Sequence, residues 1–311
     1  MNVSSMPKQR RGARNRRSNA RARSRVGLLV VVLLILAIVV AIAAINRQIK
    51  GYFTGSRELP IPQASATSIL APPPSPIVQT PSPAVSGPIS GTGPRVAIII
   101  DDCGYNVNRC KQFLAMPIPI TISILPMTPH GKELETDAVA AGKSVMLHLP
   151  MEADSPLAHP GQGAIMTAMS DAEVVAQVEA DLASVPDVPG ANNHMGSKAT
   201  SDPRVMRDVL QVFQKHHLFF IDSMTSYTTV AATTARALGI PTAQRDVFLD
   251  DSRDLQYIEG QFAQLQRVAL KRGSAIAIGH PFDTTAQALK EAIPEMQAAG
   301  ITFVTARSLV K

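Results

Sequence analysis

Val96-Ala97-Ile98-Ile99-Ile100 is followed at once by Asp101 and Asp102, and this stretch decides how the large domain folds. A short run rich in β-branched residues predicts a buried strand. Two carboxylates at the carboxyl end of such a strand are costly to bury, and their like charges repel each other. Either a metal ion binds there or one aspartate keeps a proton, so the sequence predicts chemistry at this strand end.

Five further apolar runs predict strands at residues 121–125, 144–149, 218–221, 274–278 and 302–304. Amphipathic stretches predict helices at residues 172–185, 203–215, 254–271 and 284–298, the last interrupted or ended near Pro294. Alternating strands and helices favour a mostly parallel sheet, and about seven repeats favour closure. We therefore predict an α/β fold, a distorted (β/α)7-type barrel with its active site at the carboxyl ends of the strands.

The N-terminal part of the chain differs in composition from the rest. Residues 1–25 hold nine basic residues and no acidic one, so the net charge of +6 becomes −3 without them. Residues 26–45 carry no charge and are long enough, at about 1.5 Å per residue, to cross a bilayer. Residues 46–94 are rich in proline and predict an extended tether. Residues 95–311 then form a single domain with a substantial core.

A basic tail beside an apolar span places the N-terminus in the cytoplasm. We therefore expect a single-pass protein of the inner membrane, with a periplasmic catalytic domain after the linker. The alternative is a cleaved signal peptide, because Ala41-Ile42-Ala43 offers a small-residue site, although the apolar stretch is longer than usual for such peptides. The mildly acidic remainder gives no indication of nucleic-acid binding.

Groups capable of metal binding or proton transfer gather near the ends of the predicted strands. They are Asp101, Asp102, His148, Asn192, Asn193, His194, Asp222 and His280. Four other histidines fall in loops or on a helix and are interpreted as surface residues, namely His130, His159, His216 and His217. Cys103 and Cys110, the two cysteines, either pair in an oxidising compartment or are small buried residues around the start of a helix.

Six motifs follow one another through the domain: IDDCG at 100–104, LHLPME at 147–152, NNHMGS at 192–197, FFIDS at 219–223, QRDVFLD at 244–250 and IGHP at 278–281. Together they resemble the divergent polysaccharide deacetylases, a branch of the NodB-like carbohydrate esterases. The resemblance covers nearly all of residues 95–311. It implies a distorted barrel and divalent-metal-dependent removal of N-acetyl groups from a glycan.

The resemblance also implies roles for particular residues. In the NodB-like group the first aspartate of the pair is a general base, the second is a metal ligand, and a histidine near the last strand is a general acid. Asp101, Asp102 and His280 occupy these positions. The ligand aspartate is joined by two histidines of an H-[ST]-x-x-H motif, and His194 matches the first of them.

The sequence departs from that motif at one position. Four residues after His194 stands Lys198, and lysine is not a usual ligand of zinc. We expect His148 to supply the second imidazole from another strand end, with Glu152 or Asp222 as weaker substitutes. The expected cofactor is a divalent metal, zinc first, with cobalt or manganese as alternatives.

Four residues are expected to bind substrate or to support these groups. Asn193 is a candidate donor to the oxyanion, Asp222 or Asp246 could orient a histidine, and Arg245 could bind Asp101 or a substrate carboxylate. The expected partner is an envelope polysaccharide or a peptidoglycan fragment. Two alternatives remain open: a catalytically inactive domain that binds glycan or an envelope protein and regulates cell-wall processing, and a hydrolase of O-acetyl esters.

Overall fold

The computed structural model describes residues 93–311, and these form a nine-stranded sheet with parallel pairing throughout. The strands are β1 (Arg95–Cys103), β2 (Thr121–Ile124), β3 (Ser144–Met151), β4 (Gly190–Met195), β5 (Phe219–Asp222), β6 (Thr242–Gln244), β7 (Val247–Phe248), β8 (Ser274–Gly279) and β9 (Thr302–Val304). Their order is β6-β5-β4-β3-β2-β1-β8-β7, with β9 paired to the first part of β1.

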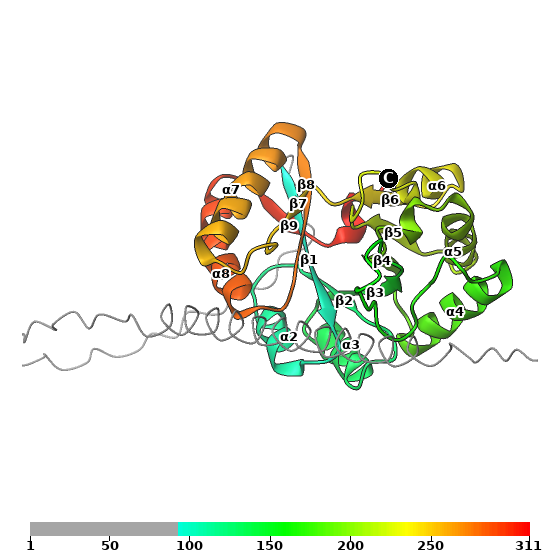
Figure 1. Ribbon diagram of the computed structural model, residues 1–311. Helices are drawn as coiled ribbons and strands as arrows, with labels where there is room; N and C mark the ends of the chain where they lie inside the picture. Colours follow the sequence, from blue (N-terminus) through cyan, green and yellow to red (C-terminus); the bar gives the residue numbers. More distant parts are fainter. Residues whose placement is uncertain (1–92) are drawn as a thin grey trace, which may run out of the picture. The chain divides into compact units, whose positions relative to one another are not determined.

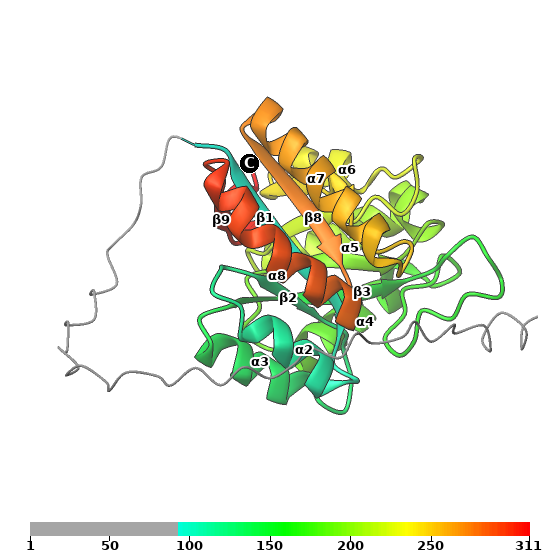
Figure 2. The ribbon, with the colours of Figure 1, turned by 90° about the vertical axis from the view of Figure 1, so that its left-hand side faces the viewer.

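Helices surround the outer side of this curled sheet (Figure 1). They are α2 (Val107–Leu114), α3 (Gly131–Ala140), α4 (Asp171–Ser184), α5 (Pro203–Lys215), α6 (Ala231–Ala237), α7 (Leu255–Arg272) and α8 (Asp283–Ala298), with 3-10 turns η1 (Ala199–Ser201) and η2 (Ala306–Leu309). Figure 2 shows α7 and α8 side by side over β1 and β8. The predicted α/β class and parallel sheet are therefore confirmed.

The predicted seven-stranded closed barrel was wrong in strand number and in closure. The described sheet has nine strands, and β6 and β7 end its two edges without pairing to each other. These two edge strands are short, with three and two residues. The fold is thus a curled, open relative of a barrel.

Side-chain alternation along β1 separates two cores. Val96, Ile98 and Ile100 belong to the large cluster between the sheet and its helices. Ala97 and Ile99 face the enclosed inner side, where η2 adds Leu309 and covers one end of the small inner cluster. Because side chains alternate along a strand, this parity determines which residues at the strand ends face the interior.

The helix predictions were accurate to within a residue or two, with one correction. Helix α8 continues through Pro294 to Ala298, although proline removes a backbone hydrogen bond there. Pro294 lies on the exposed side, while its neighbour Ile293 and the nearby Met296 are buried. Packing of the buried side outweighs the local cost of the proline.

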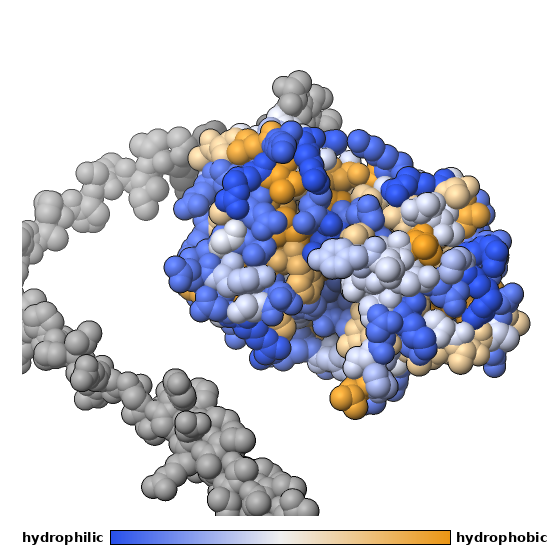
Figure 3. Space-filling model, turned by 45° about the horizontal axis from the view of Figure 1, so that its top comes forward, coloured by the Kyte–Doolittle hydropathy of each residue, from blue (hydrophilic) through white to orange (hydrophobic). Residues whose placement is uncertain are grey.

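The predicted basic tail, the apolar span of residues 26–45 and all but the last two residues of the linker lie outside the described residues. From Gly93 onward, none of the helices has the length and apolar character needed to cross a bilayer. The face of the domain in Figure 3 is mostly hydrophilic, with hydrophobic residues confined to a narrow band and small patches.

Candidate metal and catalytic site

Strand register brings the polar residues of distant motifs to one place. His148 of β3 pairs directly with Asn192 of β4, and two residues further along β4 lies His194 on the same side. Ile100 of β1 pairs with Gly279 of β8, so the next residues, Asp101 and His280, lie at the same level of the sheet. Alternation places these side chains on the same inner side of the sheet as Ile99 and Ile278. They meet at the carboxyl end of the sheet.

A β-bulge lets two adjacent aspartates face the same side. In the pairing of β1 with β2, Ile100 opposes Ile122 and Cys103 opposes Ile124, so Asp101 and Asp102 together oppose a single residue. Asp102 adopts a left-handed backbone with φ of 55°. Without this extra residue, alternation would turn Asp102 toward the helices.

Three side chains converge as a candidate metal site. Ligand atoms of Asp102, His148 and His194 all lie within 4.8 Å of one another. Oδ1 of Asp102 is 3.3 Å from Nε2 of His148 and 2.9 Å from Nδ1 of His194. That oxygen is buried, and no donor within residues 93–311 reaches it in hydrogen-bond geometry. An orphaned carboxylate oxygen facing two imidazoles fits a divalent cation.

Asn192 connects this ligand group to Asp101. Its Nδ2 donates to both carboxylate oxygens of Asp101, at 2.9 and 3.1 Å. Its Oδ1 accepts from Ser123 Oγ at 2.6 Å and lies 2.9 Å from Nδ1 of His148. Since Oδ1 only accepts, Nδ1 of His148 carries the proton and Nε2 presents its lone pair to the site. The fully buried amide therefore orients both a candidate base and a candidate ligand.

His280 approaches from the opposite side of the site. Its Nε2 lies 3.7 Å from Oδ2 of Asp102, while its Nδ1 bonds Oδ1 of Asp250 at 2.8 Å. The other oxygen of Asp250 accepts from the His280 backbone N–H and from Thr285 Oγ1, at 2.6 and 2.7 Å. Rings of Phe248 and Phe282 pack on the imidazole. The histidine is thus held with Nε2 toward the site.

Burial and neighbouring charges separate the protonation states of these groups. Burial raises the pKa of Asp101, while the charge of His148 opposes that rise. Burial also acts to raise the pKa of Asp102, but the nearby imidazoles of His148 and His194 outweigh it and lower the pKa overall. For His280, burial lowers the pKa, yet bonding to Asp250 outweighs it and raises the pKa to about 9. At neutral pH an anion at Asp102 therefore faces a cation at His280.

Comparison with known proteins identifies the family to which this chain belongs. A family model described as divergent polysaccharide deacetylase matches residues 98–310. The chain belongs to this family. The sequence resemblance is thereby confirmed over almost the whole described domain.

Two relatives and one solved structure also resemble this divergent polysaccharide deacetylase chain. The uncharacterized protein YibQ of Escherichia coli (strain K12) is 38% identical over 218 residues, which cover 70% of this chain and 67% of that protein. An uncharacterized protein of Haemophilus influenzae is 37% identical over 196 residues, covering 63% and 70%. The crystal structure of an uncharacterized protein from Agrobacterium tumefaciens C58 has the same fold, with a TM-score of 0.67, 23% identity, and 70% and 89% coverage.

Four residues expected to support this deacetylase-type site lie elsewhere or bond other groups. Asn193 binds the backbone N–H of Ser223 and the carbonyl of Met195. Asp222 accepts from the Met224 N–H and Thr229 Oγ1 in the loop after β5. In β4 and β5, both residues alternate with inner-facing neighbours and therefore face the helices.

Arg245 and Asp246 also differ from expectation. The Arg245 guanidinium donates to the carbonyls of Ser223 and Met224 and stacks on Phe248 rather than contacting Asp101. Asp246 binds Arg272 and the backbone N–H of Ile276, so it anchors the start of β8. The carboxylate that orients His280 is Asp250, which the sequence prediction omitted although its motif contained it.

Lys198 and Glu152 bind each other and not the candidate ligands. Nζ of Lys198 lies 2.7 Å from Oε1 of Glu152. Neither residue joins the described cluster of Asp102, His148 and His194. The expectation that His148 stands close to His194 agrees with the geometry, since their ring centroids are 4.9 Å apart.

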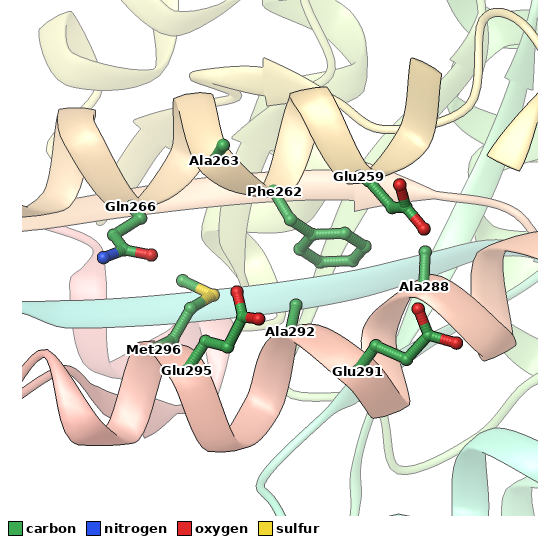
Figure 4. A pocket seen from close by; sticks show the side chains of 9 residues that line it. All are labelled: Glu259, Phe262, Ala263, Gln266, Ala288, Glu291, Ala292, Glu295 and Met296. Carbon is green, nitrogen blue, oxygen red and sulfur yellow. The ribbon is translucent and has the colours of Figure 1, made fainter. Parts of the chain in front are cut away.

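Two other features of the described domain have no part in this geometry. Cys103 and Cys110 are buried with their sulfur atoms 2.7 Å apart, one on β1 beside the bulge and one on α2. A separate groove lies between α7 and α8, where Phe262 points toward Ala288 and Ala292 (Figure 4). Its polar lining residues are Glu259, Gln266, Glu291 and Glu295, so it contains no histidine or cysteine for the chemistry expected here.

Proposed function

We propose that the domain is a metal-dependent hydrolase that removes N-acetyl groups from an envelope glycan. The observation that carries this proposal is the meeting of Asp102, His148 and His194, with Asp101 on one side and His280 on the other. The proposal extends the family assignment from a deacetylase-like fold to a particular reaction. It also includes the location predicted from residues 1–94, on the periplasmic side of the inner membrane.

The ligand set supports zinc as the cofactor, with cobalt or manganese as alternatives. Two imidazoles and one carboxylate form a set used in catalytic zinc sites, which keep further positions for water and substrate. When bound, such a cation polarises an acyl carbonyl and lowers the pKa of water to about 7. A metal ligand needs a free lone pair. The fixed tautomer of His148 leaves one on Nε2, and Oδ1 of Asp102 has no hydrogen-bond donor among the described residues.

Asp101 is the proposed general base. Its carboxylate is buried and held by the amide of Asn192, with one oxygen 3.5 Å from Nε2 of His148. Burial raises its pKa and thus makes it a better proton acceptor than an ordinary exposed aspartate. Asp101 takes a proton from water as the water oxygen attacks the acetamide carbon.

His280 is the proposed general acid. Because its pKa is about 9, the ring carries a proton at neutral pH. Asp250 fixes Nδ1, so the transferable proton is on Nε2, which faces the site. Donation of this proton to the amide nitrogen lets the C–N bond break, and the products are acetate and a free amine on the sugar.

The experiment uses the full-length protein, stripped of metal and then supplied with Zn²⁺, Co²⁺ or Mn²⁺. Acetate release is measured from chito-oligomers and from peptidoglycan fragments, each with N-acetyl or O-acetyl groups. We expect metal-dependent release from N-acetylated substrate and loss of at least about a hundredfold in kcat for Asp101→Asn. Release only from O-acetylated glycan would reassign the bond.

A non-catalytic glycan-binding domain is the second candidate, favoured by Lys198 at the position of the missing histidine. Tight binding of the oligomers without acetate release under any metal would support that candidate and overturn the hydrolase proposal. Asp102→Asn distinguishes the two further. It should abolish metal binding and hydrolysis together if the cation is catalytic, and should leave glycan binding intact if the domain only binds.

A further inference from the structure

Residues 152–167 form a loop whose ends are fixed at β3. Met151 bridges to Ile165, the Glu152 N–H donates to the Ile165 carbonyl, and the Ile165 N–H donates to the Pro150 carbonyl. The two bonds are each 2.9 Å long. Between them the chain extends outward and returns before α4. The base of the loop is therefore continuous with the sheet that holds the candidate metal site.

The tip of this loop reaches the candidate site. His159 and Gln162 line one cleft together with Asp102, His194 and Tyr105. Tyr105 follows the bulge of β1, is 56% exposed and lines this cleft. His159, interpreted from sequence as a surface residue, is therefore close to the proposed chemistry. The loop forms one wall of the opening above the ligands.

Glu152 ties the two ends of the loop to the segment after β4. Its Oε2 accepts from both the N–H and Oγ1 of Thr167, each at 2.6 Å. Its Oε1 accepts from Nζ of Lys198 at 2.7 Å, and its carbonyl accepts from the backbone N–H of Lys198 at 3.1 Å. One carboxylate thus closes the loop and joins it to the position where the resemblance expected a metal ligand.

The outgoing and returning parts of the loop have further anchors. The Asp154 N–H donates to Oγ of Ser197 at 2.9 Å. Gly163 has a φ of 79° and lies so close to the buried Asp181 of α4 that a β-carbon would collide with its carboxylate. These contacts leave the tip as the part of the loop free to meet a ligand.

We infer that residues 152–167 are the outer wall of the substrate cleft, that Tyr105, His159 and Gln162 bind the sugar, and that Lys198 positions this wall through Glu152. The inference rests on the proposed function for the ligand, an N-acetylated aminosugar chain. The Gln162 amide both donates and accepts, as acetamide and hydroxyl groups require, and His159 offers a ring nitrogen. The Tyr105 ring supplies an apolar face with a polar tip. Lys198 is a positioning residue that holds the wall, instead of a lost ligand.

The first test addresses the positioning role without any substrate. Backbone hydrogen exchange is compared in the full-length protein, Lys198→Met, Lys198→Arg and the control Lys215→Met, which removes an exposed ion pair with Glu179. We expect exchange across residues 153–164 to rise up to about fivefold in Lys198→Met, the size that an exposed ion pair allows. Lys198→Arg should restore slow exchange, and the control should match the wild type. Unchanged exchange in Lys198→Met overturns the positioning role.

The second test addresses the sugar. With chito-oligomers, Lys198→Met should raise KM up to about fivefold while kcat stays within about twofold, and Lys198→Arg should restore KM. His159→Ala and Gln162→Ala should each raise KM by about five- to tenfold, with Zn²⁺ affinity unchanged by titration. If the protein hydrolyses the oligomers and none of these variants changes KM, the assignment of residues 152–167 as the wall of the substrate cleft is wrong. If wild-type protein neither binds nor hydrolyses the oligomers, the ligand assignment fails together with the proposed function, whereas hydrogen exchange still decides the role of Lys198.

Discussion

At the scale of single residues, Asn192 joins two groups of the candidate site. Its amide bonds Asp101 on one side and lies beside Nδ1 of His148 on the other, in a position without solvent exposure. Its side-chain oxygen keeps the imidazole proton of His148 on Nδ1 and leaves Nε2 unprotonated toward the site. Sequence reasoning selected Asn193 instead, because both asparagines precede His194 and only strand parity separates them.

Asn192→Ala should therefore weaken metal binding and catalysis together. We expect a loss of about 10- to 100-fold in Zn²⁺ affinity, because the imidazole of His148 would no longer be held in one tautomer. Titration of the metal-free protein measures this. Thermal unfolding of the same sample shows whether the fold is retained, and unchanged affinity in a folded variant would contradict the orienting role.

Asp250→Asn should reduce turnover more than binding. The substitution keeps an acceptor for the His280 ring but removes the negative charge that favours the protonated imidazole. We expect kcat to fall by about 10²-fold with KM changed less than about threefold, since a general acid acts only in the transition state. Steady-state kinetics decide this, and an equal loss in an Asp246→Asn variant would argue against a specific role.

At the scale of elements, the connection from β1 to α2 combines several local requirements. Gly104 has a φ of 129°, and a β-carbon there would collide with the side chain of Thr128. Asn106 caps α2 by accepting from the Arg109 N–H. The bulge, the glycine and the cap together turn the chain sharply, and this brings Cys110 back over Cys103.

We expect the two cysteines to form a disulfide when the protein matures in an oxidising compartment. The two sulfur atoms are already 2.7 Å apart. Thiol–disulfide exchange with an external disulfide would join them and would reduce that external disulfide to two thiols. Alkylation in denaturant should then modify neither cysteine without reductant and both with it. The bond should add about 2 kcal/mol to the free energy of unfolding. Two alkylated thiols in protein never exposed to reductant would contradict this.

Helix α4 contains a buried acid that should make stability depend on pH. Burial raises the pKa of Asp181 to about 7, against an ordinary value of about 3.9 in the unfolded chain. The folded state therefore binds more protons between these values, and the free energy of unfolding falls as pH rises from about 4 to 7. Asp181→Asn should remove about 2–4 kcal/mol of that fall, measured by urea unfolding at pH 4, 5.5 and 7. Parallel curves for variant and wild type would contradict it.

At the scale of the whole molecule, the inner side of the curled sheet needs its small core. Leu309 of η2 packs against this cluster and is 8% exposed. Leu309→Ala should lower the free energy of unfolding by about 2–4 kcal/mol, because it leaves a cavity where the sheet is not closed. Leu270→Ala, at a residue that is 51% exposed, should change it by less than about 0.5 kcal/mol. Urea unfolding of both variants tests the comparison.

Much of this architecture could be predicted from local pattern, and the misses have physical causes. Strands such as β1 and β8 are apolar runs, so periodicity found them. Strand β4 reads Gly-Ala-Asn-Asn-His-Met, and its inner-facing side chains are the site itself, so it lacks the apolar signal. The two short strands β6 and β7 depend on neighbours in the sheet, which no local window contains.

The candidate site followed the same division between local and non-local information. The family resemblance selected Asp101, Asp102, His194 and His280, and a strand-end position selected His148. The fold gathers all five at one end of the sheet. Partners such as Asn192 and Asp250 depend on side-chain parity within strands and on pairing between them. Side chains alternate between the two faces of a strand. Since Ile221 faces the inner side of the sheet, Asp222 faces the helices, and since Phe248 faces the inner side, so does Asp250.

The left-handed backbone at Asp102 has a consequence for how such domains change over time. A non-glycine residue in that conformation is strained by about 1–3 kcal/mol, and glycine would relieve the strain while deleting the carboxylate. A lineage that did not need the proposed hydrolysis would lose nothing by replacing Asp102 with glycine, and its domain would become more stable. At this position the proposed metal chemistry and the stability of the fold favour different residues.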